Sequence, residues 1–110
     1  MLKNQTSNLS LELDIKELKS VLEKSIGLMF SKKPSGVFFK TRFGIHTFLM
    51  KFPLDIVIVD ADSKTVKIKK NLEPNKIFFW NPRFEKVLEL PVGTVDKLKI
   101  EAGHILKFNL

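Results

Sequence analysis

The side chains of this sequence that could carry chemistry lie beside strongly apolar stretches. Asp55 ends the segment Phe52-Pro53-Leu54-Asp55 and leads directly into the apolar run Ile56 to Val59. A carboxylate at the edge of a core either accepts backbone N–H bonds or pairs with a nearby base, or it serves a pocket as an acid, a base or a polar anchor. The structural interpretation of Asp55 is favoured, because hydrogen bonds and ion pairs commonly explain such carboxylates.

An imidazole and an indole are the other two candidates. His46 lies in the apolar segment Gly44 to Phe48, where a histidine is usually a half-buried structural side chain, although it could act as an acid or a base near Asp55. Trp80 precedes Asn81-Pro82-Arg83, and a tryptophan at a strand end can keep one edge exposed over a pocket.

A group of lysines forms the densest basic segment and is a candidate anion-binding surface: Lys64, Lys67, Lys69, Lys70 and Lys76. Aromatic residues follow it, and lysines beside aromatic rings could bind single-stranded nucleic acid, with the bases stacked on the rings. However, a small β-rich domain needs its phenylalanines inside, and a lysine face is usually only solvated. Nucleic acid is therefore a possible partner that is not favoured.

Several classes of site are excluded by composition. The chain has no cysteine, so it has no disulfide, no thiolate metal site and no cysteine nucleophile. Phosphate-binding glycine loops, nucleophile elbows and zinc-protease helices are absent. His46 and His104 could join Asp60 or Asp62 in a metal site only if the fold gathered them, since their spacing matches no ligand motif. We predict no metal and no cofactor.

The length indicates a single domain over residues 1–110, and the lack of a signal peptide indicates a cytoplasmic one. The first fourteen residues lack the apolar core of a signal peptide, and no apolar run reaches membrane-spanning length, so no membrane partner is expected. The net charge of +7 indicates either an anionic partner or only solubility and adaptation to heat.

Hydrophobic periodicity predicts the elements that must position these residues. Leu9, Leu11 and Leu13 alternate with polar residues, as in a half-buried strand. A helix is predicted over 15–26, capped by Asp14 and ended by Gly27, with Glu17 completing a capping box. Further strands are predicted at 37–39, 45–50, 55–59, 65–69, 76–80, 86–90 and 105–108, and a short helix at 94–98. The strand at 55–59 is expected to be buried on both faces. This pattern indicates a mainly β fold, α+β tending to all-β, arranged as a sandwich or barrel with one N-terminal helix.

Three short motifs occur in a characteristic order. They are Gly27-Leu28-Met29-Phe30, Phe52-Pro53-Leu54-Asp55 with Ile56 to Asp60, and Val87-Leu88-Glu89-Leu90 followed by Gly93. In this order, the chain resembles the domain of unknown function 192 family from about residue 14 to residue 108. The resemblance implies a compact, jelly-roll-like β fold with one helix, and it implies no established reaction. Where many relatives carry Trp-Met, this chain has His46-Thr47, so any pocket there would be more polar.

The family positions that this chain carries are Met29, Pro53, Asp55, Glu89 and Gly93. Asp55 and Glu89 are the polar ones among them, and a cleft that both face would be the site. The candidate pocket is thus bordered by His46, Asp55, Trp80 and Glu89.

The preferred hypothesis is a non-catalytic module that binds an unknown small ligand or a protein at this pocket. One alternative is an acid–base enzyme, a hydrolase or an isomerase, that uses Asp55, Glu89 and His46. The other is nucleic-acid binding through the face from Lys64 to Lys76.

Overall fold

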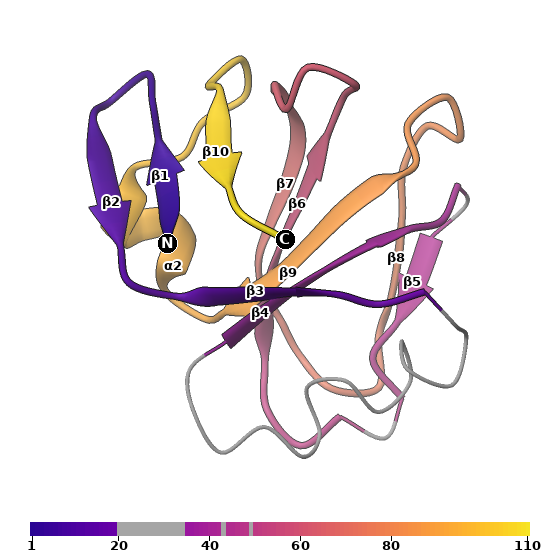
Figure 1. Ribbon diagram of the computed structural model, residues 1–110. Helices are drawn as coiled ribbons and strands as arrows, with labels where there is room; N and C mark the ends of the chain where they lie inside the picture. Colours follow the sequence, from indigo (N-terminus) through magenta and orange to yellow (C-terminus); the bar gives the residue numbers. More distant parts are fainter. Residues whose placement is uncertain (20–34, 43, 49) are drawn as a thin grey trace.

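The computed structural model describes residues 1–19, 35–42, 44–48 and 50–110 of the chain. Figure 1 shows a mostly β molecule with one short helix among these residues. The elements are β1 Leu2–Asn4, β2 Leu9–Leu11, β3 Asp14–Glu17, β4 Ser35–Lys40, β5 Gly44–His46, β6 Leu54–Val59, β7 Thr65–Leu72, β8 Ile77–Phe79, β9 Lys86–Pro91, α2 Thr94–Leu98 and β10 Leu106–Phe108.

A five-stranded sheet in the order β3-β4-β9-β6-β7 organises the fold. Its strands are antiparallel except for β3 and β4, which run parallel. All six residues of β6 are buried, as predicted for a strand covered on both faces. The central strand, β9, has neighbours on both sides, so its side chains lie in the middle of each sheet face.

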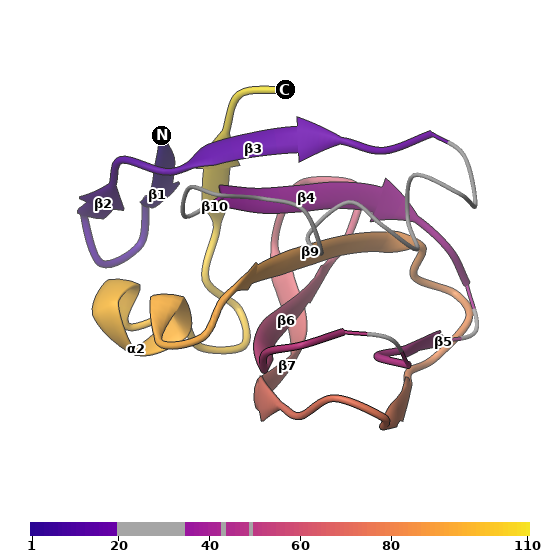
Figure 2. The ribbon, with the colours of Figure 1, turned by 90° about the horizontal axis from the view of Figure 1, so that it is seen from below.

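Two apolar clusters cover the two faces of this sheet. On one face, Val57 and Leu88 pack against the three-stranded sheet β10-β1-β2 and against α2. On the other face, Ile56 and Val87 pack against the ribbon formed by β5 and β8. Figure 2 shows α2 and β1 on one side of the five-stranded sheet and β5 on the other. This second side carries the pocket described below.

Most strand predictions are confirmed, with small differences at their ends. The predicted strand over 45–50 is shorter, because β5 ends at His46 and a turn follows. The Thr47 hydroxyl holds this turn, since it donates to the Glu73 carbonyl at 2.6 Å and accepts from the Lys76 N–H at 2.9 Å. The short helix predicted at 94–98 is α2.

The helix predicted from residue 15 is wrong at its start, because Asp14–Glu17 form β3. Residues 20–26 of that prediction lie outside the described residues. Ile15 and Leu18 would share a helix face, but in an extended chain a separation of three residues places them on opposite sides. Ile15 accordingly joins the first cluster and Leu18 the second.

The mainly β prediction is confirmed, whereas the barrel alternative is wrong for the described strands, which divide into three separate sheets. No helix in the described part of the chain is both long enough and apolar enough to cross a membrane.

Candidate functional site

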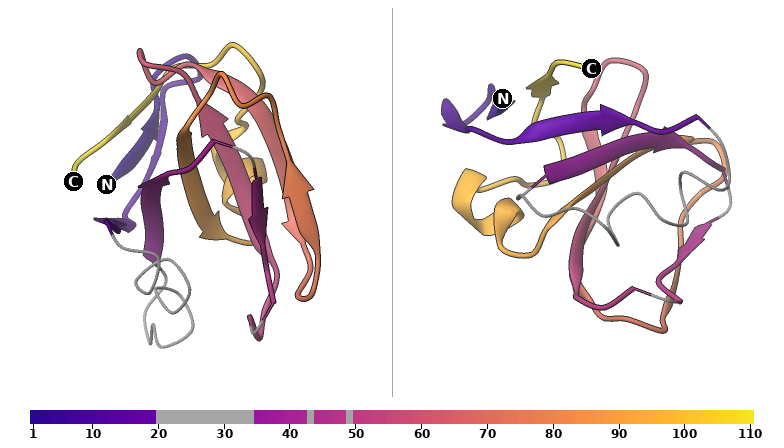
Figure 3. Two further views of the ribbon diagram at one scale, coloured as in Figure 1. Left: turned by 90° about the vertical axis from the view of Figure 1, so that its right-hand side faces the viewer. Right: turned by 60° about the horizontal axis from the view of Figure 1, so that its bottom comes forward.

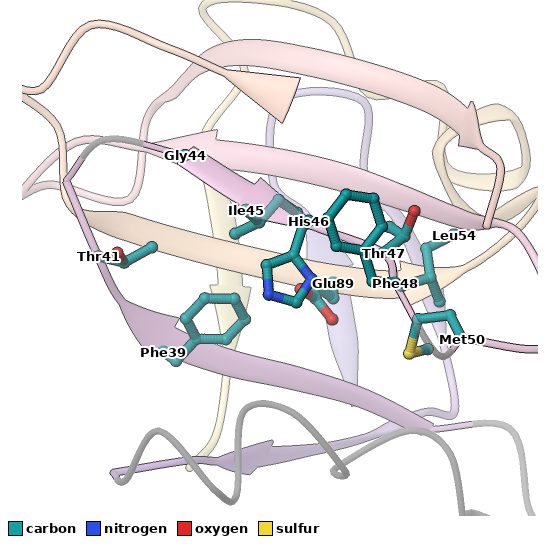
Figure 4. A pocket seen from close by; sticks show the side chains of 10 residues that line it. All are labelled: Phe39, Thr41, Gly44, Ile45, His46, Thr47, Phe48, Met50, Leu54 and Glu89. Atoms are coloured by element: carbon teal, nitrogen blue, oxygen red, sulfur yellow. The ribbon is translucent and has the colours of Figure 1, made fainter. Parts of the chain in front are cut away.

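A pocket of about 210 Å³ opens between the ribbon side of the central sheet and the turn that follows β5. Figure 4 shows the side chains that surround it, which come from β4, β5, β6 and β9 and the turns beside them. Its lining consists of Phe39, Thr41, Gly44, Ile45, His46, Thr47, Phe48, Met50, Leu54 and Glu89.

Glu89 lies at the centre of this apolar surface. On β9 it stands between Val37 of β4 and Ile56 of β6, and its side chain is on the same sheet face as Val87. Glu89 is only 8% exposed. Within the described part of the chain, the Glu89 carboxyl has no hydrogen-bond partner and no ion pair. Burial raises the pKa of this carboxyl to about 8, since the charged form loses its hydration there. At pH 7 the group is therefore mostly protonated.

His46 lies at the open side of the same pocket. It is exposed, and its ring stacks on Phe48 with the two ring centroids 4.8 Å apart. The imidazole and the Glu89 carboxyl both line the pocket, but no hydrogen bond joins these two groups. The structure thus brings together two of the four predicted site residues, one as a buried acid and the other as part of an aromatic wall.

Asp55 does not line this pocket. It points to the opposite face of β6 from Leu54, and it is 1% exposed. Its carboxylate accepts N–H bonds from Asn71, Gly93 and Val95, each at 3.0 Å. These contacts tie β6 to the end of β7 and to the first turn of α2. The Asp55 carboxylate therefore has the hydrogen-bonding role that the structural interpretation predicts.

Trp80 is also absent from the lining of the pocket. It is 6% exposed within the second apolar cluster, where its ring packs against Phe78 at 5.8 Å. Its indole N–H donates to the Phe84 carbonyl at 2.8 Å. Trp80 thus supports the ribbon from inside and forms no exposed edge over the pocket.

The five lysines of the predicted basic surface make different contacts, and only two of them line the same groove. Lys67 donates to the Phe79 carbonyl and lies 5.3 Å from the centroid of the Phe78 ring. Lys70 forms an ion pair with Asp96 of α2 at 3.1 Å. Lys69 and Lys70 line a wide groove beside α2, whereas Lys64 and Lys76 lie outside that groove. Among the described residues, no group of three or more potential metal ligands comes together.

Comparison with known proteins identifies the family. The family model DUF192, described as uncharacterized ACR, matches residues 2–108. The chain belongs to this family. UPF0127 protein PH1112 of Pyrococcus horikoshii is 29% identical over 98% of both chains.

Two solved structures share the DUF192 fold. One is a protein of unknown function from Novosphingobium aromaticivorans, which is 21% identical and matches with a TM-score of 0.75. The match covers 97% of this chain and 82% of the other. A protein from Sinorhizobium meliloti, which its name puts forward as a transcription regulator, is 23% identical with a TM-score of 0.76. That match covers 96% of this chain and 88% of the other. At these identities, both matches show the fold alone.

Two of the three DUF192 motifs meet in the described part of the chain. The Gly93 N–H that bonds to Asp55 joins the second motif to the third. Glu89 belongs to the same third motif but faces the pocket side. Met29, in the first motif, lies outside the described residues. The second motif therefore supplies the buried hydrogen-bond acceptor Asp55, and the third supplies Glu89, whose carboxyl lines the pocket.

Sequence reasoning missed part of the pocket wall. Phe39 lies two residues after Val37, which pairs with Glu89, so the period of two in β4 could have placed Phe39 beside the acid. Phe48 and Met50 follow β5 in an irregular turn, where no periodicity indicates the direction of a side chain.

Proposed function

We propose that this chain is a single cytoplasmic domain, a jelly-roll-like sandwich, that binds a small ligand in the Glu89 pocket without catalysing a reaction. The ligand would have a small apolar body and one polar group. A cavity of about 150 Å³ is enough to hold benzene. The pocket of about 210 Å³ therefore has room for a ring or a short alkyl chain together with a polar group.

The observation that supports this proposal is the position of Glu89. A carboxyl group on the central strand of a sheet face otherwise covered by Val37, Phe39 and Ile56 loses hydration and gains no hydrogen bond from the described residues. Burial of an unpaired polar group costs about 1–3 kcal/mol in proteins. A hydrophobic residue would avoid this cost, so the carboxyl is best explained by a ligand that bonds to it.

Binding without chemistry is favoured by the separation of the acidic groups. The acid–base alternative assigns Asp55, Glu89 and His46 to one site. Asp55 is buried on the other face of β6 with its hydrogen bonds satisfied, and His46 makes no hydrogen bond with Glu89. The pocket thus has one buried acid and aromatic walls, which suits recognition of an apolar group and a polar group.

The test is ligand binding observed by NMR. We would titrate the protein with benzyl alcohol, benzylammonium and benzoate, and follow the resonances of Ile45, Met50 and Leu54 in the pocket. At least one probe should shift these resonances to saturation. Thr41→Trp should fill the pocket and abolish the shifts, whereas Ser10→Trp, on an exposed position of β2, should leave them unchanged. The proposal fails if no probe gives saturable shifts, or if the shifts persist in Thr41→Trp.

A further inference from the structure

We propose that the polar group recognised in this pocket is a primary ammonium group on a short apolar body, bound as an ion pair by Glu89. This inference rests on the proposed function, because it names the ligand of the same site. Three features of the pocket support it: its charge, its aromatic walls and the titration of its acid.

The first feature is that no basic side chain of the described residues pairs with Glu89, although the protein is basic. The sequence has 19 lysines and arginines against 12 acids, yet no lysine or arginine of the described residues lines the pocket. Arg42, just beyond Thr41 of the lining, instead pairs with Glu85 at 3.3 Å and donates to the Pro82 carbonyl at 3.2 Å. No cation of the described residues therefore occupies the place beside Glu89 where a ligand cation would be most stabilised.

The second feature is the aromatic lining. Phe39 and Phe48 flank the pocket, as Figure 4 shows, and aromatic faces attract cations. Ile45, Met50 and Leu54 complete an apolar surface for the rest of the ligand. A desolvated ion pair is strong only when its two groups meet in good geometry. The Glu89 carboxyl is fixed on β9 among aromatic and apolar side chains, so a compact ammonium group suits it best.

The third feature is the titration of Glu89, whose pKa is raised to about 8 by burial. An ammonium group binds the carboxylate form, so binding must lower that pKa. Below pH 8, affinity should therefore rise by up to about tenfold for each pH unit, and it should level off above pH 8. A neutral alcohol should show no such rise.

Among the described residues, few other groups face Glu89 and could titrate with it. From β4 the residues that face Glu89 are Val37 and Phe39, and from β6 they are Leu54 and Ile56, none of which titrates. β5 contributes His46, the other titratable group of the described lining. His46→Gln is therefore the control that separates its titration from that of Glu89.

The experiment measures the affinities of benzylammonium, benzyl alcohol and benzoate by NMR titration at about pH 6, 7 and 8.5. At the highest pH, benzylammonium should bind about tenfold or more tightly than benzyl alcohol, and benzoate should bind most weakly. Glu89→Gln should remove the preference for ammonium and its pH dependence. Binding of benzyl alcohol should persist in that variant, which shows that the pocket is intact.

The matched control is Glu73→Gln, which removes the same charge at an exposed site outside the lining. It should retain the ammonium preference, and His46→Gln should retain the rise with pH. Benzyl alcohol or benzoate binding as tightly as benzylammonium would overturn the inference while leaving the proposed function standing. If none of the three binds, the proposed function itself fails.

The ammonium group could belong to a free amine or to a lysine side chain. Nα-acetyl-lysine-methylamide therefore serves as a fourth probe. If it binds more tightly than benzylammonium, the source is a lysine of a partner chain, and if it binds more weakly, the source is a free amine. Both results identify the source of the ammonium group, and the inference still requires that benzylammonium binds more tightly than benzyl alcohol.

Discussion

Glu89 and Asp55 show how two carboxyl groups of neighbouring strands come to differ. Both are nearly inaccessible to solvent, and they lie on opposite faces of the same sheet. Asp55 meets three backbone N–H groups, so its charge is compensated by hydrogen bonds. Glu89 meets apolar side chains, so its proton is retained. The first group stabilises the fold, whereas burial of the second without a partner among the described residues lowers the stability of the fold.

Glu89 should make the stability of the protein depend on pH. Its pKa is 4.5 ordinarily and about 8 in the folded chain. Between these values the folded protein keeps a proton that the unfolded chain releases, so the free energy of unfolding falls as the pH rises, by up to about 1.4 kcal/mol per pH unit. Urea unfolding across this range should show that Glu89→Gln loses this slope and that Glu73→Gln keeps it. Equal slopes in wild type and Glu89→Gln would contradict the burial of the acid.

Asp55 should be essential for stability. Asp55→Ala leaves three N–H groups without their acceptor, and hydrogen bonds to charged groups contribute about 1.5–3 kcal/mol each without adding fully. We expect a loss of about 3 kcal/mol or more in the free energy of unfolding, measured with urea. Asp62→Ala, at an exposed turn, should change it by less than about 0.5 kcal/mol. A loss as small as that of Asp62→Ala would show that the three bonds contribute little.

For the secondary-structure elements, prediction from sequence succeeded where a single hydrophobic periodicity dominated the segment. The continuous apolar run of β6 follows directly from its burial on both faces. In β7 the exposure alternates from Val66 to Lys69, but a register shift in the pairing with β6 places Val66 in the second cluster and Ile68 in the first. The segment from Asp14 was ambiguous, because Ile15 and Leu18 suit a helix face and also suit the two sides of a strand. Its partner β4 decided the outcome, since a parallel pairing depends on residues about twenty positions away. A single sequence carries no local signal for that pairing.

Gly36 of β4 leaves room for the side-chain ends of Ile15 in β3 and Leu90 in β9. A Cβ atom at this position would be 2.7 Å from the Ile15 Cδ1 atom and 2.9 Å from the Leu90 Cδ2 atom. Gly36→Ala should therefore destabilise the protein by about 1–3 kcal/mol through overpacking. Ile15→Val removes the Cδ1 atom, so the double variant should be more stable than the sum of the two single losses predicts. Simple additivity in urea unfolding would show that Ile15 does not cause the strain.

In the whole molecule, the two faces of the five-stranded sheet are covered differently. One side is closed by the two ends of the chain, because β1 pairs with β10, and Figure 3 shows both termini on that side. The other side carries the pocket. The sequence indicated β10 from its apolar residues but gave no sign of β1, whose three residues are stable only through a partner about a hundred positions away. The candidate site was half predicted for the same reason: Glu89 and His46 converge only through the pairings of β4, β5 and β9.

Asn4 holds the two ends of the chain together, and its replacement should weaken the whole molecule. Its side chain is 0% exposed, donates to the Leu98 carbonyl at 2.9 Å and to the Lys99 carbonyl at 3.3 Å, and lies 3.0 Å from the Nδ1 atom of His104. Since groups left without partners cost about 1–3 kcal/mol each, Asn4→Ala should lower the free energy of unfolding by about 2–3 kcal/mol. The pocket should survive this change, because Asn4 packs on the other side of the central sheet.

Urea unfolding of Asn4→Ala measures the loss of stability, with the exposed Asn109→Ala as the control. Titration of the folded Asn4→Ala variant with the probes shows whether the pocket still binds. Equal stability of the two variants would show that β-sheet pairing alone joins the termini, whereas loss of probe binding in folded Asn4→Ala would show that the two sides of the sheet are coupled.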